Sequence, residues 1–341
     1  YGRRNGVVFA LWFAGAWILT EWLRATLFTG FAWNPLSVVA LEPFNMPHGL
    51  KLFGAYGASG LIIVFCGIIA WGIMAIKVAS SRDRVALFAK MCFAGMGANA
   101  AFAALDWASD TAAVSSPTRT IRIVQPNIGQ QDKYNESFNA INFARLAEQT
   151  GRPGSTPRLI LWPEAAIPDR LDADTDDSAR SRDRLVELLG PNDVLLTGAD
   201  KIFEEKHAKG VATEGRWIGA ANSVFAINAQ GKILWRYDKA HLVPYGEYLP
   251  MRPFMSAIGL SRLVPGDLDF WPGPGPRSHD VPGFGKVGLQ VCYEIIFSGQ
   301  VVDRANRPDF IFNPTNDAWY GDWAPPQHLA HARLRAIEEG L

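Results

Sequence analysis

The sequence predicts an α/β layered domain preceded by transmembrane α-helices, and three observations carry that prediction. Charge is uneven along the chain, because residues 1–117 hold 13 charged side chains whereas residues 118–341 hold 53. Apolar runs of about 20 residues, the length that crosses a bilayer, recur in the first part. Short β-branched runs alternate with helical patterns in the second part. We therefore divide the chain into a membrane domain with its linker, residues 1–117, and a folded domain, residues 118–341.

Three segments of the membrane domain are predicted to be transmembrane helices, at residues 6–31, 57–76 and 85–105. The second segment carries no charge, and Lys90 lies near the start of the third, where its long stem can reach the interface. A buried core helix would explain any single segment, but three within 105 residues favour membrane insertion. A cleaved signal peptide fits poorly, because the segments recur and no small-residue cleavage site follows the first.

The placement of Lys and Arg predicts the orientation of these segments, since cations flank the cytoplasmic ends of transmembrane helices. Two cations, Arg3 and Arg4, precede the first segment. A cluster of four, Lys77, Arg82, Arg84 and Lys90, runs from the end of the second segment to the start of the third. With both groups in the cytoplasm, the chain leaves the membrane at Asp106 on the opposite face. A polar linker, residues 106–120, then leads to an extracytoplasmic folded domain.

Two ionisable residues lie in the second half of the first segment. Glu21 and Arg24 are three residues apart and therefore share a helix face. An ionisable pair within a transmembrane helix often has a function. A simple interfacial pair at the outer end of the helix is an equally good explanation.

The folded domain contains a series of strand and helix patterns. Strands are predicted at residues 121–125, 159–162, 194–197, 222–228, 233–237, 287–291 and 309–313. Helices are predicted at residues 136–149, 178–189, 298–305 and 326–339. A hairpin is expected across Ala229, Gln230 and Gly231, because glycine supplies the positive φ that such a turn needs.

Composition excludes several classes of protein. Lys+Arg and Asp+Glu both number 33, and a net charge of zero argues against nucleic-acid binding. Cys66, Cys92 and Cys292 are too few and too scattered for a disulfide scaffold or a zinc site. His328 and His331 share a predicted helix but have no acidic or cysteine partner at a spacing that completes a metal site. We expect no metal and no organic cofactor.

Three predicted strands end in reactive side chains. Glu164 follows the second strand, Lys239 follows the fifth, and Cys292 follows the sixth. Strand ends line the usual active-site crevice of an α/β sheet. There Glu serves as a general base, Cys as a nucleophile whose thiolate the ammonium favours, and Lys as the group that stabilises an oxyanion. Each residue alone also fits an ordinary core or solvated position.

The motifs around these residues resemble those of the nitrilase superfamily: WPEAA at residues 162–166, DKAHLVPYGEYLP at 238–250 and VCYE at 291–294. Further segments are similar to one branch of it, the apolipoprotein N-acyltransferases. They are TEWLR at residues 20–24, TGFAW at 29–33, QPNIGQQDKY at 125–134, and NDAWYGD and QHLAHARLRAIE between residues 316 and 338. The resemblance implies an α-β-β-α sandwich for the folded domain.

The resemblance also implies a reaction. Such enzymes move an acyl chain from a membrane phospholipid, through a cysteine thioester, to the N-terminal amine of the diacylglyceryl-cysteine of a bacterial apolipoprotein. The expected location is the bacterial inner membrane, which the chain crosses several times, with the catalytic domain on the periplasmic side. The partners are a phospholipid donor and a diacylated apolipoprotein acceptor, without nucleic acid.

Residue roles follow from the same resemblance. Cys292 matches the nucleophile, Glu164 the general base and Lys239 the oxyanion-stabilising lysine. Three residues match supporting positions: Glu247, Tyr293 and Glu294. The amide of Tyr293 is expected to be an oxyanion donor beside Lys239. Tyr134 stands where the family is expected to have Trp, and is assigned to substrate binding.

Two alternatives share these residues. One is a membrane-tethered amidase or nitrilase that hydrolyses a C–N bond, and the other is a catalytically inactive domain that only binds lipoproteins. The intact set of Glu164, Lys239 and Cys292 argues against the inactive domain. Relative to the family, we expect the chain to lack helices before TEWLR and to be truncated at the C-terminal end of the catalytic domain.

One long loop, residues 250–276, is apolar and rich in Pro and Gly, which is typical of functional loops. We expect a mobile lid that dips into the bilayer through five apolar side chains: Met251, Phe254, Met255, Ile258 and Leu260. A loop packed against its own domain is the alternative.

Overall fold

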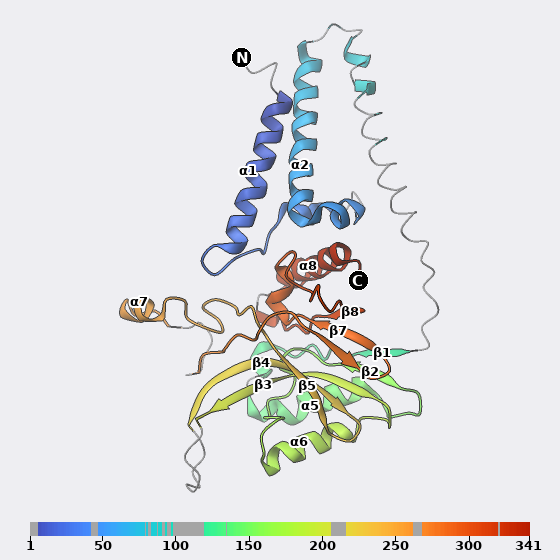
Figure 1. Ribbon diagram of the computed structural model, residues 1–341, viewed down its shortest axis with the longest axis vertical. Coiled ribbons are helices and arrows are strands. Elements are labelled where there is room, and N and C mark those ends of the chain that lie inside the picture. Colours follow the sequence, from blue (N-terminus) through green and yellow to red (C-terminus); the bar gives the residue numbers. More distant parts are fainter. Residues whose placement is uncertain are drawn as a thin grey trace. The chain divides into compact units, whose positions relative to one another are not determined.

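A computed structural model describes residues 6–41, 47–78, 119–133, 135–205, 216–261, 268–319 and 321–341, with scattered positions between 80 and 97 (Figure 1). The chain forms two compact units. One comprises Tyr1–Ser115, Ile296–Gly299 and Leu329–Leu341, and the other comprises Ser116–Ile295 and Gln300–His328.

The larger sheet of the second unit has five strands in the order β1-β2-β3-β4-β5. They are β1 (Thr120–Ile123), β2 (Arg158–Leu161), β3 (Val194–Glu204), β4 (Trp217–Asn228) and β5 (Ile233–Asp238). The first three strands are parallel, whereas β4 and β5 join antiparallel. In this order, β3 and β4 lie between β2 and β5. Residues of β3 and β4 therefore lie between the ends of those two strands.

The predicted hairpin between β4 and β5 is confirmed. Asn228 accepts hydrogen bonds through its Oδ1 from the amides of Gln230 and Lys232, both at 3.0 Å. Gly231 has a φ of 72°, the left-handed conformation that glycine adopts without strain.

The smaller sheet has three strands in the order β6-β7-β8: β6 (Ser278–Val281), β7 (Gly285–Leu289) and β8 (Phe310–Phe312). The strand β6 is missing from the sequence prediction. It is four residues long, reads SHDV and lies at the edge of its sheet, so it has neither the length nor the apolar alternation that marks a strand.

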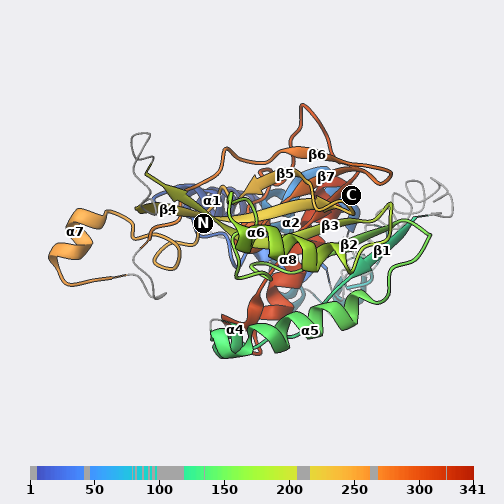
Figure 2. The same ribbon diagram turned by 90° about the horizontal axis from the view of Figure 1, so that it is seen from below.

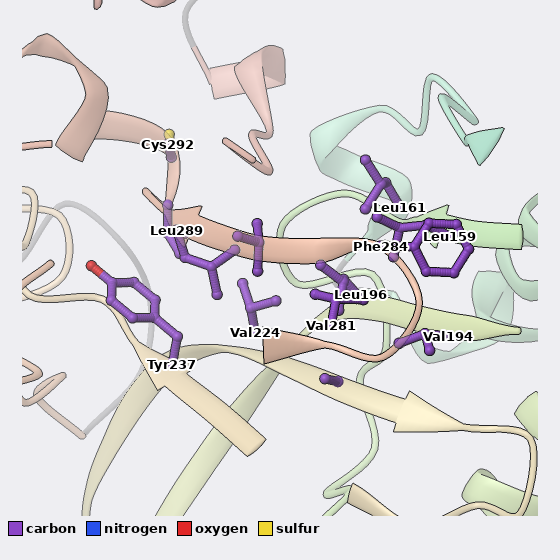
Figure 3. Close-up of a cluster of buried hydrophobic side chains, with 13 residues drawn as sticks. Leu159, Leu161, Val194, Leu196, Val224, Tyr237, Val281, Phe284, Leu289 and Cys292 are labelled. Atoms are coloured by element: carbon purple, nitrogen blue, oxygen red, sulfur yellow. The ribbon is translucent and has the colours of Figure 1, made fainter. Parts of the chain in front are cut away.

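Two apolar cores give this unit its layers. One lies between the sheets, where Leu196 and Val224 of the larger sheet meet Val281 and Leu289 of the smaller one (Figure 3). The other lies on the opposite face of the larger sheet, beneath α5 (Asn139–Thr150) and α6 (Asp176–Val186) (Figure 2). The order helix, sheet, sheet agrees with the predicted sandwich. The helix α8 (Ala324–Glu339) begins in this unit, and its residues from Leu329 onward belong to the other.

The predicted helix at residues 298–305 is wrong, because this stretch forms turns and bends. Gly299 has a φ of 76°, outside the right-handed helical region. The Asp303 carboxylate accepts hydrogen bonds from the amides of Ala305 at 3.0 Å and Asn306 at 3.1 Å. Short side chains that bind nearby amides in this way compete with helix formation.

The remaining elements of this unit are short: α4 (Gln130–Lys133), α7 (Arg252–Ala257) and the 3-10 helices η2 (Glu136–Phe138), η3 (Cys292–Ile296) and η4 (Asp317–Trp319).

Among its described residues, the other unit contains two helices that are long and apolar enough to cross a membrane. They are α1 (Gly6–Thr26) and, within α2 (Pro47–Val78), the stretch Leu50–Lys77. The helix in the first predicted segment ends at Thr26 rather than at residue 31, and the helix in the second begins at Pro47 rather than at residue 57. Gly54, with a φ of 65°, breaks the helical geometry of α2 close to its start. The third predicted segment, at 85–105, and the linker lie almost wholly outside the described residues.

Small residues let α1 and α2 approach closely. A Cβ atom added at Gly67 would lie 2.6 Å from the Cβ atom of Ala10, and one added at Gly60 would lie 2.5 Å from Ile18 Cδ1. Within a bilayer, helices associate through such close backbone contacts, since lipid gives apolar side chains no reason to leave it. Large side chains on the outside of α1, such as Phe9 and Trp12, are exposed and suit contact with lipid.

Glu21 and Arg24 bind the segment that follows α1. Glu21 accepts hydrogen bonds from the amide of Leu36 at 2.8 Å and from Trp17 Nε1 at 2.9 Å. The Arg24 guanidinium donates to the side chain and to the carbonyl oxygen of Asn34. The 3-10 helix η1 (Leu36–Ala40) begins at this point. These two residues therefore hold the chain directly after TGFAW against the end of α1.

Candidate active site

Three strand ends bring Glu164, Lys239 and Cys292 into one buried site. Glu164 follows β2 and Lys239 follows β5. Cys292 begins η3 after β7 and is labelled in Figure 3. Their exposed fractions are 7%, 1% and 8%. The Glu164 carboxylate, the Lys239 ammonium and the Cys292 thiol therefore interact through protein rather than through bulk water.

A close approach between β3 and the loop after β2 fixes Glu164. The amide of Gly198 donates to the carbonyl oxygen of Pro163 at 3.2 Å, and Ala165 has a φ of 43°. A Cβ atom at Gly198 would lie 2.3 Å from the Ala165 nitrogen, so only glycine fits here. The loop therefore lies directly on the backbone of β3.

Glu164 is held as a carboxylate. Its Oε1 accepts from Asn222 Nδ2 at 2.8 Å and its Oε2 from the amide of Asn316 at 2.9 Å. Burial raises its pKa, but the ammonium groups of Lys239 and Lys133 and these hydrogen bonds outweigh burial, so the pKa is lowered. A buried carboxylate that stays ionised is ready to accept a proton.

Lys239 lies between two carboxylates. Its Nζ is 2.9 Å from Glu247 Oε1 and 3.6 Å from Glu164 Oε1. Burial alone lowers the pKa of a lysine, yet the charges of Glu247 and Glu164 raise that of Lys239 well above its usual range. The ammonium is therefore permanent and is available to an oxyanion.

Cys292 adopts a strained backbone conformation, with a φ of 51°. Its amide donates to the carbonyl oxygen of Pro314 at 2.9 Å. Burial first, and then the carboxylate of Glu164, raise the pKa of the thiol well above its usual value, and Lys239 offsets only part of this. Lys239 favours the thiolate, as expected, but burial and the carboxylates outweigh it, so the thiol holds its proton until a base accepts it.

Glu247 and Glu294 have different roles, which the sequence left open. Glu247 binds Lys239 and also accepts from Asn222 Nδ2 at 3.1 Å and from the amide of Val243 at 2.7 Å. It therefore belongs to the charged cluster and sets the position of the lysine.

Glu294 binds backbone instead. It accepts from the amides of Ala240 at 2.7 Å, His241 at 3.0 Å and Val291 at 2.6 Å, and from the hydroxyl of Tyr237 at 3.0 Å. Burial raises its pKa despite these bonds. Glu294 thus ties the chain after β5, which carries Lys239, to the chain after β7, which carries Cys292.

The other two predicted residues are placed differently. Tyr293 is buried, and its ring meets that of His241 edge-on with centroids 6.0 Å apart. Tyr134 lies outside the described residues, so its assignment to substrate binding stays a prediction.

Sequence reasoning missed several residues of this site. Asn222, on β4, bridges Glu164 and Glu247 through one amide nitrogen. Lys133 Nζ donates to the carbonyl oxygen of Glu164 at 2.9 Å, and burial lowers the pKa of this lysine. Asp200, on β3, has its pKa raised by burial to about 6. Only the position of Lys133 within QPNIGQQDKY gave a signal.

The arrangement suits acyl transfer through a covalent intermediate. It combines an ionised base, a permanent cation and a protonated nucleophile on three separate loops, as nucleophilic catalysis requires. Among the described residues, no three His, Cys, Asp or Glu side chains are grouped in a way that would hold a metal ion.

Comparison with known proteins places the chain in a family. The family model for carbon-nitrogen hydrolases matches residues 120–341. The model for the apolipoprotein N-acyltransferase N-terminal domain matches residues 1–69. The chain belongs to the carbon-nitrogen hydrolase family.

Curated relatives agree with this placement. The apolipoprotein N-acyltransferase of Rhodopseudomonas palustris is 33% identical over 332 residues, which cover 95% of this chain and 59% of the relative. That of Brucella melitensis biotype 1 is 33% identical over 350 residues, which cover 99% and 61%. The chain therefore spans about three fifths of the length of these relatives. The match to the N-terminal domain model and the two apolar helices among the described residues indicate a membrane protein.

Solved structures of the carbon-nitrogen hydrolase type are similar to the chain. The NitN amidase from Neterenkonia sp. AN1 is 19% identical, with a TM-score of 0.32, over 65% of this chain and 72% of that one. The carbon-nitrogen hydrolase from Helicobacter pylori G27 is 15% identical, with a TM-score of 0.35, over 64% and 68%.

Proposed function

We propose that the protein transfers an acyl chain from a membrane phospholipid to the N-terminal amine of a diacylated apolipoprotein, through a thioester on Cys292. The observation that carries this proposal is the buried cluster of Glu164, Lys239 and Cys292, in which Lys239 Nζ lies 3.6 Å from Glu164 Oε1. Glu164 is ionised and Cys292 is protonated, so attack must begin with transfer of the thiol proton to the carboxylate. The names of the relatives supply the acyl chemistry.

In the first half-reaction, Glu164 takes the thiol proton while Cys292 Sγ forms a bond to the ester carbonyl carbon. The oxyanion meets the Lys239 ammonium and the amide of Tyr293. The ester C–O bond then breaks, Glu164 returns its proton to the departing glycerol oxygen, and a lysophospholipid leaves.

In the second half-reaction, the lipoprotein amine attacks the thioester carbonyl and gives a proton to Glu164. The C–S bond breaks, and Glu164 protonates the sulfur to restore the thiol. An α-amine has a pKa of about 7.7–8.0, so a useful fraction is neutral and nucleophilic near pH 7.

The loop that contains α7 supports a lipid substrate. Met251, Phe254, Ile258 and Leu260 are 63%, 61%, 57% and 50% exposed, and Met255 is half-buried. Both views show α7 standing apart from the two sheets (Figures 1 and 2). Four of the five side chains are thus at least half exposed, and we propose that they enter the bilayer.

The test incubates the purified protein in lipid nanodiscs with phospholipid and a diacylated lipopeptide, and follows protein and lipopeptide by mass spectrometry. The proposal expects an acyl adduct on Cys292 that disappears as the lipopeptide gains one chain. Released fatty acid with an unchanged lipopeptide would instead identify a hydrolase. Absence of an adduct in both the wild type and Cys292→Ala would identify an inactive binding domain.

A further inference from the structure

Two side chains bind the carbonyl oxygen of Cys292. Asn313, which follows β8, donates through Nδ2 at 3.2 Å, and His328 of α8 lies with Nε2 at 3.0 Å. The same Asn313 nitrogen also donates to the carbonyl oxygen of Gln290 at 2.6 Å. His328 is 3% exposed, so this contact excludes water. The peptide bond after the nucleophile is therefore held from one side by two separate elements.

The proton on His328 is fixed by its neighbours. A carbonyl oxygen only accepts, so Nε2 must carry a hydrogen. The other ring nitrogen, Nδ1, lies 2.6 Å from Asp317 Oδ1, and this pair shares one further hydrogen. Asp317 thus holds the ring in the orientation in which Nε2 donates to the Cys292 carbonyl, as carboxylates do for catalytic and metal-binding histidines.

Holding this carbonyl also determines where the next amide points. The peptide unit is planar, and in the trans form its C=O and N–H bonds point in opposite directions. The peptide between Cys292 and Tyr293 follows a residue with a φ of 51°, a conformation that needs support from its surroundings. Hydrogen bonds to the oxygen also polarise the amide and make its N–H a stronger donor.

We propose that His328, held by Asp317 and assisted by Asn313, is a positioning residue that aims the Tyr293 amide at the oxyanion. The inference rests on the proposed function, because it assigns that amide to the tetrahedral intermediates. It gives α8 a role in the reaction, although none of its side chains needs to touch substrate. It also explains His328 without a metal ion.

The test compares His328→Leu, which removes the donor, with His328→Gln, whose side-chain amide is long enough to donate to the Cys292 carbonyl oxygen. Two rates are measured at Cys292. Acylation by phospholipid, or by a soluble p-nitrophenyl ester, forms an oxyanion, whereas alkylation by iodoacetamide does not. Loss of a whole oxyanion donor costs about 10²–10³ in kcat, so a misaligned donor is expected to slow acylation by about 10–10² in kcat.

For His328→Leu we expect slower acylation with KM little changed, and alkylation within about twofold of the wild type. For His328→Gln we expect the acylation rate to recover to within about tenfold of the wild type. The matched control is His331→Leu. His331 lies three residues along the same helix, is fully buried and bonds to the carbonyl oxygen of Trp33 instead. Its loss should lower the melting temperature without separating the two rates.

Several results would overturn the positioning role. Acylation by His328→Leu at the wild-type rate would do so, as would an equal fall in acylation and alkylation. If His328→Leu does not fold, His328→Asn replaces it, because the Asn amide is too short to reach the Cys292 carbonyl oxygen. Equal acylation rates for His328→Asn and His328→Gln would then contradict the proposal. A wild type that reacts with the soluble ester but not with phospholipid would reject the proposed function alone.

Discussion

Glu164 and Cys292 oppose one another electrostatically in the resting site. The Glu164 carboxylate helps to raise the pKa of the thiol, while Lys239 and Lys133 keep the carboxylate itself ionised. A protonated thiol is a poor nucleophile and also reacts slowly with oxidants. The site therefore stays unreactive until an ester is close enough for the proton to move as the bond forms.

Glu164→Gln separates the role of Glu164 as a general base from its effect on the pKa of the Cys292 thiol. Thioester formation from phospholipid should fall by about 10²–10⁴, because the general base is lost. The pKa of the Cys292 thiol should fall as well, because one of the charges that raised it is gone. The measurement is the pH profile of iodoacetamide alkylation, whose midpoint should move to lower pH in the variant.

The control for this variant is Glu148→Gln, on the exposed surface of α5. It should leave both the thioester rate and the alkylation profile at their wild-type values. An alkylation midpoint for Glu164→Gln at or above that of the wild type would contradict the charge coupling.

At the scale of elements, the contact between β3 and the loop after β2 decides where the base lies. Gly198→Ala should push that loop away, because the added Cβ atom would lie 2.3 Å from backbone at Ala165. We expect a loss of stability of about 1–3 kcal/mol, seen as a lower melting temperature, and a larger relative loss of thioester formation.

Gly154→Ala is the matched control, since its added Cβ atom would meet no atom within 4 Å. Replacing a flexible glycine at such a position should leave the melting temperature unchanged or slightly raised. Equal behaviour of the two variants would show that the close approach at Gly198 does not constrain Glu164.

The exposed side chains around α7 lead to a prediction about substrate access. Replacing Met251, Phe254, Ile258 and Leu260 together with Ser should slow turnover of phospholipid in nanodiscs and spare a soluble ester probe. Their exposure means that the melting temperature in detergent should change by little, since few intramolecular contacts are lost. An equal loss with both substrates would rule out a bilayer-entering loop.

For the whole molecule, the predicted orientation is testable by cysteine labelling. Arg84 and Glu205 are exposed and lie in the predicted cytoplasmic loop and in the catalytic domain. An impermeant maleimide added to spheroplasts should label Glu205→Cys, and should label Arg84→Cys only after the membrane is opened. The parent chain, whose three cysteines lie in predicted spans or in the buried site, is the control. Labelling of both variants in intact spheroplasts would reject the orientation.

Much of this organisation was predictable from sequence, for reasons that differ between features. Strand ends such as those at Glu164 and Cys292 follow from short apolar runs that stop abruptly, and membrane helices follow from length and hydropathy alone. The edge strand β6 was not predictable, because its edge position outweighs its low strand propensity. The turns at 298–305 were not predictable either, because the Asp303 side chain binds nearby amides and outweighs the local helix propensity. Asn222 was missed and His328 was given no role, because their partners lie 58 and 36 residues away in sequence.

The backbone at Cys292 has one further consequence. A left-handed φ costs most residues about 1 kcal/mol or more, and glycine almost nothing. Folding alone would thus prefer glycine at the position where the chemistry needs sulfur. The protein gives up some stability at its proposed nucleophile, and a lineage released from the need for the reaction would have little reason to keep cysteine there.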